Sequence, residues 1–254
     1  MIRIAAVGDI HVGEDSRGRL RPGFASLREN ADVLLLAGDL TRCGSPSEAQ
    51  VLVEELDGAG VPVVAVLGNH DHHAARVKEL TSVLRTGGVT VLEGASTVVE
   101  VDGCRVGIAG TKGFGGGFAG ASGSDFGEPE MKAFVGHTKA LAQRLHDSLA
   151  SLDTDYRVAL LHYAPVPDTL AGERLEIFPF LGSYLLAEAI DSAGCDLVLH
   201  GHAHGGTEKG VTAGGVHVRN VAQPVIRQAY ARYCLGADSI SSATSRTMSG
   251  AAAP

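Results

Sequence analysis

Carboxylates, an amide and imidazoles recur in this sequence in short groups, each directly after an apolar run. The groups are Asp9-x-His11, Gly38-Asp39, Gly68-Asn69-His70-Asp71, His162 and Gly201-His202-x-His204. Oxygen and imidazole ligands without sulfur suit Mn, Fe, Zn or Co, and so many imidazoles disfavour a purely magnesium or calcium site. The residue types therefore predict a metal site, provided that the fold brings the groups together.

The apolar runs that precede these groups are typical of buried strands. "IRIAAV" (2–7), "DVLLLA" (32–37) and "VPVVAV" (61–66) are nearly continuous in apolar residues, as expected for strands covered on both faces. "YRVALLHY" (156–163) and "CDLVLHGH" (195–202) have the same character. Ligands of open α/β sheets gather outside the carboxyl ends of the strands, so we expect the polar groups to meet there.

Two of the groups place ligand types two residues apart. Side chains at that spacing in extended backbone point the same way. Asp9 with His11, and His202 with His204, are therefore expected to act as paired ligand arms if the backbone stays extended.

Helices are expected between the strands. In 45–60, Ser45 is a predicted N-cap, Pro46 the first helical residue and Glu48 the partner in a capping box. A second helix is predicted before "VTVLEG" (89–94), and this strand–helix alternation indicates a parallel sheet with right-handed crossovers.

The second half is expected to alternate in a similar way. Residues 97–110 read as a hairpin that turns at Asp102-Gly103. Further expected elements are helices over 129–152 and 183–193, a strand over 215–221 and a later β segment over 225–233. The glycine-rich stretch 111–127 lacks periodicity and is either a mobile lid over a site or a flexible surface connection.

Composition indicates one globular α/β domain. The 254 residues are 44% hydrophobic and 20% charged, with a net charge of −8 that argues against nucleic acid or an anionic membrane as a partner. No apolar run approaches the ~20 residues needed to cross a bilayer, and the N-terminus lacks a signal-peptide pattern. The four cysteines form no CxxC pair, which favours a reducing cytoplasm. We expect a domain over 1–236 and a disordered tail over 237–254.

The ordered set of motifs resembles the calcineurin-like metallophosphoesterase superfamily, in particular its small single-domain bacterial members. The resemblance runs from residue 9 to residue 204 and includes every metal-ligand element of the family pattern. It implies an α/β fold, namely a four-layer αββα sandwich of two mixed β-sheets flanked by helices, with a two-metal centre.

The resemblance also implies a role for each motif residue. One metal would be held by Asp9, His11, Asp39 and His204. The other would be held by Asp39, Asn69, His162 and His202. Asp39 would bridge the two ions and His70 would face the substrate as the catalytic residue. The cofactors are expected to be two divalent or trivalent ions of Mn, Fe or Zn, with Mn or Fe favoured.

The implied activity is hydrolysis of a small phosphate ester, first of all a phosphodiester such as a cyclic nucleotide. A nucleotide or metabolite phosphomonoesterase is the alternative, and a catalytically silent protein-binding scaffold is a further one. "GDLTRCG" has Arg42 where protein serine/threonine phosphatases have a second aspartate, which argues against that branch. The oligomeric state stays open.

Other polar residues near the motifs have two interpretations each. Asp71 is expected either to accept a hydrogen bond from an imidazole or to cap the following helix. His72 and His73 are expected to be solvated in the first turn of that helix. His200 is expected to be a strand residue that supports the site.

Three residues near the motifs are less specific. Arg42 and Lys112 could reach a substrate phosphate, although most such residues are simply solvated. Cys43 is expected to be a packed free thiol.

Overall fold

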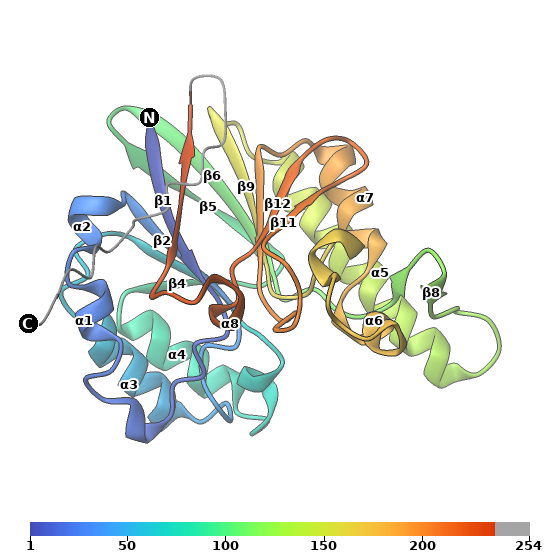
Figure 1. Cartoon of the computed structure of the whole chain (residues 1–254), viewed down its shortest axis with the longest axis horizontal. Coiled ribbons are helices and arrows are strands. Elements are labelled where there is room, and N and C mark those ends of the chain that lie inside the picture. The colour runs from blue at the N-terminus through green and yellow to red at the C-terminus, as the bar shows by residue number, and fades with distance from the viewer. Residues whose placement is uncertain (237–254) are drawn as a thin grey trace, which may run out of the picture.

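Two β-sheets lie face to face with helices on their outer faces (Figure 1). The computed structural model describes residues 1–236, and the predicted tail over 237–254 lies outside them. The first sheet has the order β13 (Ala231–Leu235), β1 (Ile2–Val7), β2 (Val33–Ala37), β3 (Val63–Val66) and β4 (Val89–Leu92). The second has the order β11 (Lys209–Val211), β12 (His217–Asn220), β10 (Leu197–His200), β9 (Tyr156–Leu161), β6 (Cys104–Thr111) and β5 (Ala95–Val101).

The helices form the two outer layers. The outer face of the first sheet is covered by α1 (Arg21–Phe24), α2 (Leu27–Asn30), α3 (Pro46–Leu56) and α4 (Val77–Thr86), at the left and lower left of Figure 1. The second sheet is covered by α5 (Pro129–Ala150) and α7 (Tyr184–Ala193). Shorter elements are α6 (Phe178–Leu181), α8 (Gln223–Ile226), the strands β7 (Gly117–Phe118) and β8 (Ala121–Ser122), and the 3₁₀ turns η1 (Glu14–Ser16), η2 (His70–His72), η3 (Pro167–Leu170) and η4 (Leu175–Ile177). No helix of residues 1–236 combines the length and apolarity that a membrane span requires.

Three hydrophobic layers hold this stack together. Ile4, Leu35 and Leu160 belong to the core between the two sheets. Leu34 packs in the layer beneath α1–α4, and Leu145 packs in the layer beneath α5 and α7. The four-layer αββα sandwich is therefore confirmed, because each sheet buries both of its faces.

Strand direction creates one functional edge. Strands β1 to β4 are mutually parallel, as are β6, β9, β10 and β12, whereas β13, β5 and β11 run antiparallel to their neighbours.

The predicted capping box of α3 is confirmed, because Ser45 accepts from the Glu48 N–H and the Glu48 carboxylate accepts from the Ser45 N–H. The hairpin at Asp102-Gly103 is confirmed as well.

Three predictions about local structure are wrong. The segment 225–233 begins in α8, which starts at Gln223 and ends at a left-handed Arg227, so β structure appears only from Ala231. His72 and His73 are exposed as predicted but precede α4, because Ala75 has a φ of 54° that interrupts the helical path. The stretch 111–127 is not a flexible surface connection in its first half, where residues 115–118 are buried and the Gly117 N–H donates to the Gly182 carbonyl.

Candidate metal centre

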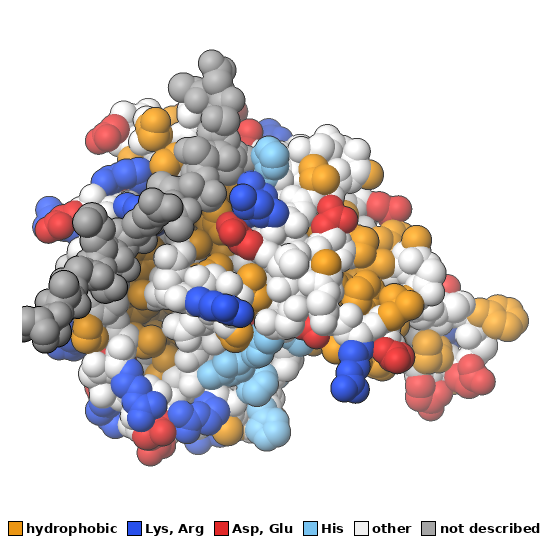
Figure 2. Space-filling view, viewed as in Figure 1, with side chains coloured by type: hydrophobic (Ala, Val, Ile, Leu, Met, Phe, Trp, Pro, Cys, Tyr) orange, Lys and Arg blue, Asp and Glu red, His pale blue; other side chains and the backbone are white. Residues whose placement is uncertain are grey.

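The predicted ligands converge at the carboxyl ends of β1, β2, β3, β9 and β10. Three groups of side chains each bring ligand atoms within 4.8 Å of one another. The groups are Asp9–His11–His204, His11–Asp39–His70 and Asp39–His162–His202. Histidine side chains gather in one patch on the face shown in Figure 2. All eight residues chosen from the sequence are brought together, since Asn69 joins them through its contact with His162.

Asp39 lies between two ligand clusters. Its Oδ1 is 3.3 Å from His162 Nε2, and its Oδ2 is 3.9 Å from His11 Nε2 and 3.9 Å from His70 Nε2. On the other side of His11, Asp9 Oδ1 is 2.8 Å from His204 Nε2. Both carboxylates are buried. A single carboxylate therefore faces both halves of the site.

The surroundings of His162 fit a cation. Its Nδ1–H donates to the Ala37 carbonyl at 2.9 Å, so in the neutral ring Nε2 presents a lone pair. Burial lowers the pKa of His162 well below its usual value and keeps the ring neutral. That lone pair faces Asn69 Oδ1 at 3.0 Å and Asp39 Oδ1 at 3.3 Å, with no proton between them. Three converging electron-pair donors in a buried position call for a positive ion.

His202 is oriented in a comparable way by a backbone group. Its Nε2–H donates to the Phe180 carbonyl at 3.1 Å, which leaves Nδ1 as the coordinating nitrogen. Burial lowers the pKa of His202 to about 3. The sequence offered no signal for Phe180 or for Ala37, because any residue supplies a carbonyl.

Asp9 and His204 form a pair that shares a proton in the metal-free protein. Burial raises the pKa of Asp9, and the hydrogen bond with Asp9 raises the pKa of His204. The Asp9 carboxylate also accepts from the His202 N–H at 2.9 Å. Cation binding at this pair would displace the proton, so metal affinity should fall in acid.

The backbone at the site is not extended, contrary to the prediction of paired arms. Asp9, His11, Asp39 and His202 have φ values of 58°, 43°, 48° and 70°. Each non-glycine residue in this left-handed region costs about 1 kcal/mol or more. Tight turns, rather than the alternation of a strand, aim these ligands at one point.

Adjacent glycines allow the loops to approach closely. A Cβ on Gly68 would lie 2.0 Å from Asp39 Oδ1, and one on Gly201 would lie 2.3 Å from Asp9 Oδ2. The glycine in each of the motifs Gly68-Asn69-His70 and Gly201-His202 is thus required because a carboxylate fills the space that a side chain would take.

Asp71 has neither of its two expected roles. Its buried carboxylate accepts from the Leu40 N–H (3.1 Å), the Thr41 N–H (2.8 Å), the Thr41 hydroxyl (2.6 Å) and the Gly68 N–H (2.8 Å). Burial raises the pKa of Asp71 to about 6, although these donors oppose the rise. Asp71 therefore joins the loop of Asp39 to the loop of Asn69.

The remaining candidates lie around the centre. His200 is a buried strand residue as expected, and its Nε2 is 2.9 Å from Thr169 Oγ1. Arg42 is exposed and pairs with Asp15 at 2.7 Å. Cys43 is a free thiol but is exposed rather than packed. Lys112 is buried, so the expectation that it is solvated is wrong.

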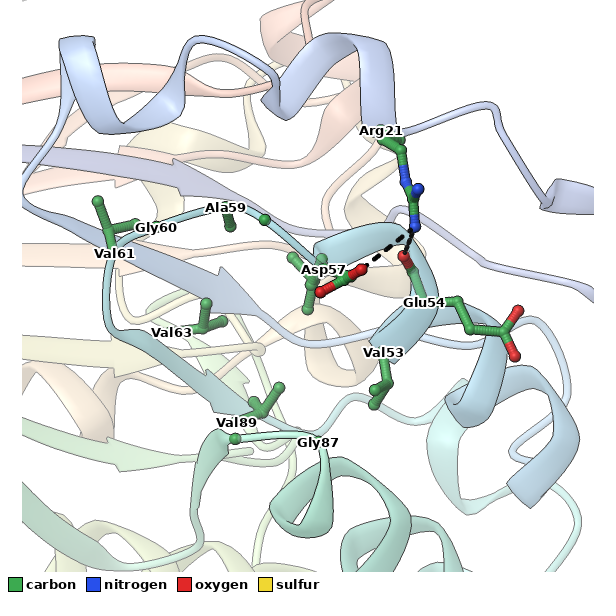
Figure 3. A pocket seen from close by; sticks show the side chains of 13 residues that line it. Arg21, Val53, Glu54, Asp57, Ala59, Gly60, Val61, Val63, Gly87 and Val89 are labelled. Atoms are coloured by element: carbon green, nitrogen blue, oxygen red, sulfur yellow. Dashed lines mark hydrogen bonds and ion pairs between the residues drawn. The ribbon is translucent and has the colours of Figure 1, made fainter.

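A separate pocket lies at the opposite end of the first sheet (Figure 3). Its wall includes Val63 and Val89, which are the first residues of β3 and β4, and Arg21 beside Asp57. No histidine or cysteine lines it. The chemistry of the molecule is therefore expected at the histidine-rich edge.

Comparisons with known proteins identify the family of the chain. A family model described as calcineurin-like phosphoesterase matches residues 2–206. A Synechococcus protein named a probable cyclic nucleotide phosphodiesterase is 34% identical over 80 residues, which is 28% of this chain and 31% of the relative. The glycerophosphodiester phosphodiesterase GpdQ of Enterobacter lignolyticus is 37% identical over 54 residues, which is 21% of this chain and 19% of the relative. The chain thus aligns with less than a third of each of these relatives.

Solved structures show the same fold at low identity. Phosphopantetheinyl hydrolase of Mycobacterium tuberculosis has a TM-score of 0.63 and 18% identity, over 88% of this chain and 90% of that one. A putative 5'-nucleotidase of Staphylococcus aureus has a TM-score of 0.59 and 17% identity, over 96% of this chain and 53% of that one.

Proposed function

The chain belongs to the calcineurin-like phosphoesterase family, and from this premise we propose that it hydrolyses a small phosphodiester at a centre of two metal ions. The observation that supports this proposal is the position of Asp39. Its two oxygens face different ligand clusters, with Oδ1 toward His162 and Oδ2 toward His11. A single-ion site would not need a buried carboxylate shared in this way.

The residues divide into two sets that share Asp39. One set would comprise Asp9, His11, Asp39 and His204. The other would comprise Asp39, Asn69, His162 and His202. When bound, two such cations would supply Lewis-acid polarisation of the phosphoryl oxygens and acidify water for in-line attack. Mn or Fe are the ions we favour, since the set contains only oxygen and imidazole ligands.

His70 is the proposed general acid. Its Nδ1–H donates to the Arg42 carbonyl at 2.8 Å, so Nε2 is the ring atom that points toward the Asp39 carboxylate. The ring is T-shaped against His11 with centroids 4.5 Å apart, and 45% of the side chain is exposed. In its imidazolium form, the ring keeps the Nδ1–H bond to the Arg42 carbonyl and can give its Nε2 proton to the leaving-group oxygen, which typically contributes ~10²–10⁴-fold.

A diester is the proposed substrate class because both relatives above are named as phosphodiesterases. Within that class, a cyclic nucleotide is our first choice. We also propose a cytoplasmic location, because all four cysteines are free and free thiols suit a reducing compartment.

Metal content and turnover test the proposal together. Protein supplied with Mn²⁺ should bind two ions per chain by elemental analysis and should hydrolyse bis-p-nitrophenyl phosphate faster than p-nitrophenyl phosphate. A panel of cyclic nucleotides then identifies the substrate. One ion per chain would contradict the shared role of Asp39, and faster monoester turnover would favour a phosphomonoesterase. Two bound ions without any turnover would favour a scaffold.

His70 is tested by removal of its ring. His70→Ala should retain both ions but lose about 10²-fold or more in rate for esters with poor leaving groups. His73→Ala is the matched control, since the exposed His73 imidazole belongs to none of the three ligand groups among residues 1–236. Its backbone N–H, which donates to the His70 carbonyl at 3.0 Å, is kept in alanine. Loss of metal from His70→Ala would make His70 a ligand rather than an acid.

A further inference from the structure

Lys112 is a buried cation beside the metal centre. It follows the last residue of β6, and its carbonyl accepts the N–H groups of His162 at 3.1 Å and Tyr163 at 3.0 Å. The residue is 8% exposed. Within residues 1–236, no carboxylate lies at ion-pair distance from the ammonium, and Glu93 and Asp39 act on it only from farther away. Its one side-chain hydrogen bond goes to the Gly113 carbonyl at 3.2 Å.

Two aromatic rings hold the ammonium group. Nζ lies 4.8 Å from the ring centroid of Phe114 and 5.0 Å from that of Tyr163. The Tyr163 ring in turn lies 4.3 Å from the ring of His202. The Tyr163 ring thus lies against both the ammonium and a predicted metal ligand.

The charge of Lys112 affects the pKa values of histidines around the site. Burial lowers the pKa of His162 and of His72, and the charge of Lys112 lowers both further. Burial also lowers the pKa of Lys112 itself, whereas the carboxylates of Glu93 and, to a lesser extent, Asp39 raise it. His162 directly follows β9, His72 lies in η2, and Asp39 lies in the loop after β2. The positive charge therefore adds to that of any cations bound by Asp39 and its neighbours.

Burial of this ammonium needs a compensating anion. A buried ammonium is destabilising unless it is paired, and cation–π contacts return only part of that cost. One carbonyl bond uses one of three N–H donors. A lysine whose aliphatic stem only packs against its neighbours would expose its ammonium to solvent. Lys139 does so, and its ammonium pairs with Asp125 on the surface.

We propose that Lys112 binds a non-bridging oxygen of the phosphoryl group of the substrate, and of the phosphate product. This inference rests on the proposed phosphoesterase function and adds a substrate-binding residue to it. Phe114 and Tyr163 hold the ammonium at the rim of the centre, and the phosphoryl oxygen supplies an anionic acceptor at hydrogen-bond distance. No covalent step is assigned to Lys112.

Inorganic phosphate is the probe that tests this role. Binding to Mn-loaded protein is measured by calorimetry for the wild type, Lys112→Met and Lys112→Arg. Loss of a hydrogen bond to a charged group is worth about 1.5–3 kcal/mol, so Lys112→Met should weaken phosphate binding about 10- to 100-fold. Lys112→Arg should restore most of the affinity, and the metal content should be unchanged in both variants.

Two further measurements separate binding from a structural role. Lys112→Met keeps the apolar stem, so its metal-free unfolding free energy should equal or exceed that of the wild type. Lys139→Met removes an exposed lysine and should leave phosphate affinity unchanged. If Lys112→Met does not fold, Lys112→Gln takes its place in the same titration.

The failure of this inference differs from the failure of the proposed function. Phosphate affinity of Lys112→Met within about twofold of the wild type would overturn the role of Lys112 even in an active enzyme. A wild type that hydrolyses no ester would overturn the proposed function, while the phosphate titration would still decide whether Lys112 binds the anion.

Discussion

Removal of the Asp71 carboxylate should separate the two loops that carry the central ligands. Its Oδ1 accepts from the N–H and the hydroxyl of Thr41, and its Oδ2 accepts from the N–H groups of Leu40 and Gly68. Leu40 follows Asp39 and Gly68 precedes Asn69 in the sequence. The carboxylate therefore links the loop after β2 to the loop after β3, beyond the ends of the two paired strands.

The magnitude follows from the number of donors left without a partner. Asp71→Ala leaves three buried backbone N–H groups without an acceptor, and each unsatisfied group costs about 1–3 kcal/mol. We expect a loss of at least ~3 kcal/mol, a large share of the ~5–15 kcal/mol that holds a domain folded. Asp71→Asn keeps the shape but turns an NH₂ group toward two N–H donors, and should cost about 2–3 kcal/mol.

Urea unfolding of the metal-free variants gives the stability change, and Mn²⁺ titration gives the effect on the site. Groups that support metal ligands typically change affinity by about 10- to 100-fold, and we expect Asp71→Asn to weaken Mn²⁺ binding by that factor. Asp153→Ala, which removes an exposed carboxylate, should stay within about 0.5 kcal/mol of the wild type. The reasoning fails if Asp71→Ala matches Asp153→Ala in stability and binds Mn²⁺ as tightly as the wild type.

Three further outcomes are expected. Gly68→Ala should displace Asp39, because the new Cβ would lie 2.0 Å from Oδ1, and should abolish metal binding, whereas Gly136→Ala has open space and should bind metal normally. Unchanged metal content in Gly68→Ala would argue against that displacement. Burial lowers the pKa of His200 from 6.5 to about 4, so the unfolded chain binds more protons between these values. The His200 contribution to the free energy of unfolding is therefore highest above pH 6.5, and it falls by about 3 kcal/mol as the pH drops to 4. His200→Gln should flatten this acid slope in urea unfolding of metal-free protein, and identical slopes would contradict it. Chelation of the metals should stop hydrolysis and lower the thermal midpoint, since a ligand at 100 times its Kd adds ~2.7 kcal/mol to the folded state; a chelated protein with the same midpoint and rate would show that no ion is needed.

Much of the architecture and the membership of the site could be predicted from sequence order. Apolar runs such as 2–7 and 32–37 have the character of strands buried on both faces, and parallel strands bring their carboxyl ends to one edge. Side chains placed directly after such runs, for example Asp39 and His162, must therefore lie near one another. The cap of α3 was equally predictable, because the two reciprocal bonds that form it join residues only three positions apart, Ser45 and Glu48.

Tertiary structure alone decided how each group is used. The left-handed backbone at Asp9 and Asp39 is held by neighbouring loops, which no local pattern encodes. Asp71 lies in the same motif as Asn69 and His70, yet its partners Leu40 and Thr41 are about 30 residues away and donate backbone N–H groups that any residue could supply. Lys112 reads as a solvated lysine because a one-dimensional pattern does not report burial, which is set by the side chains that other segments pack around it.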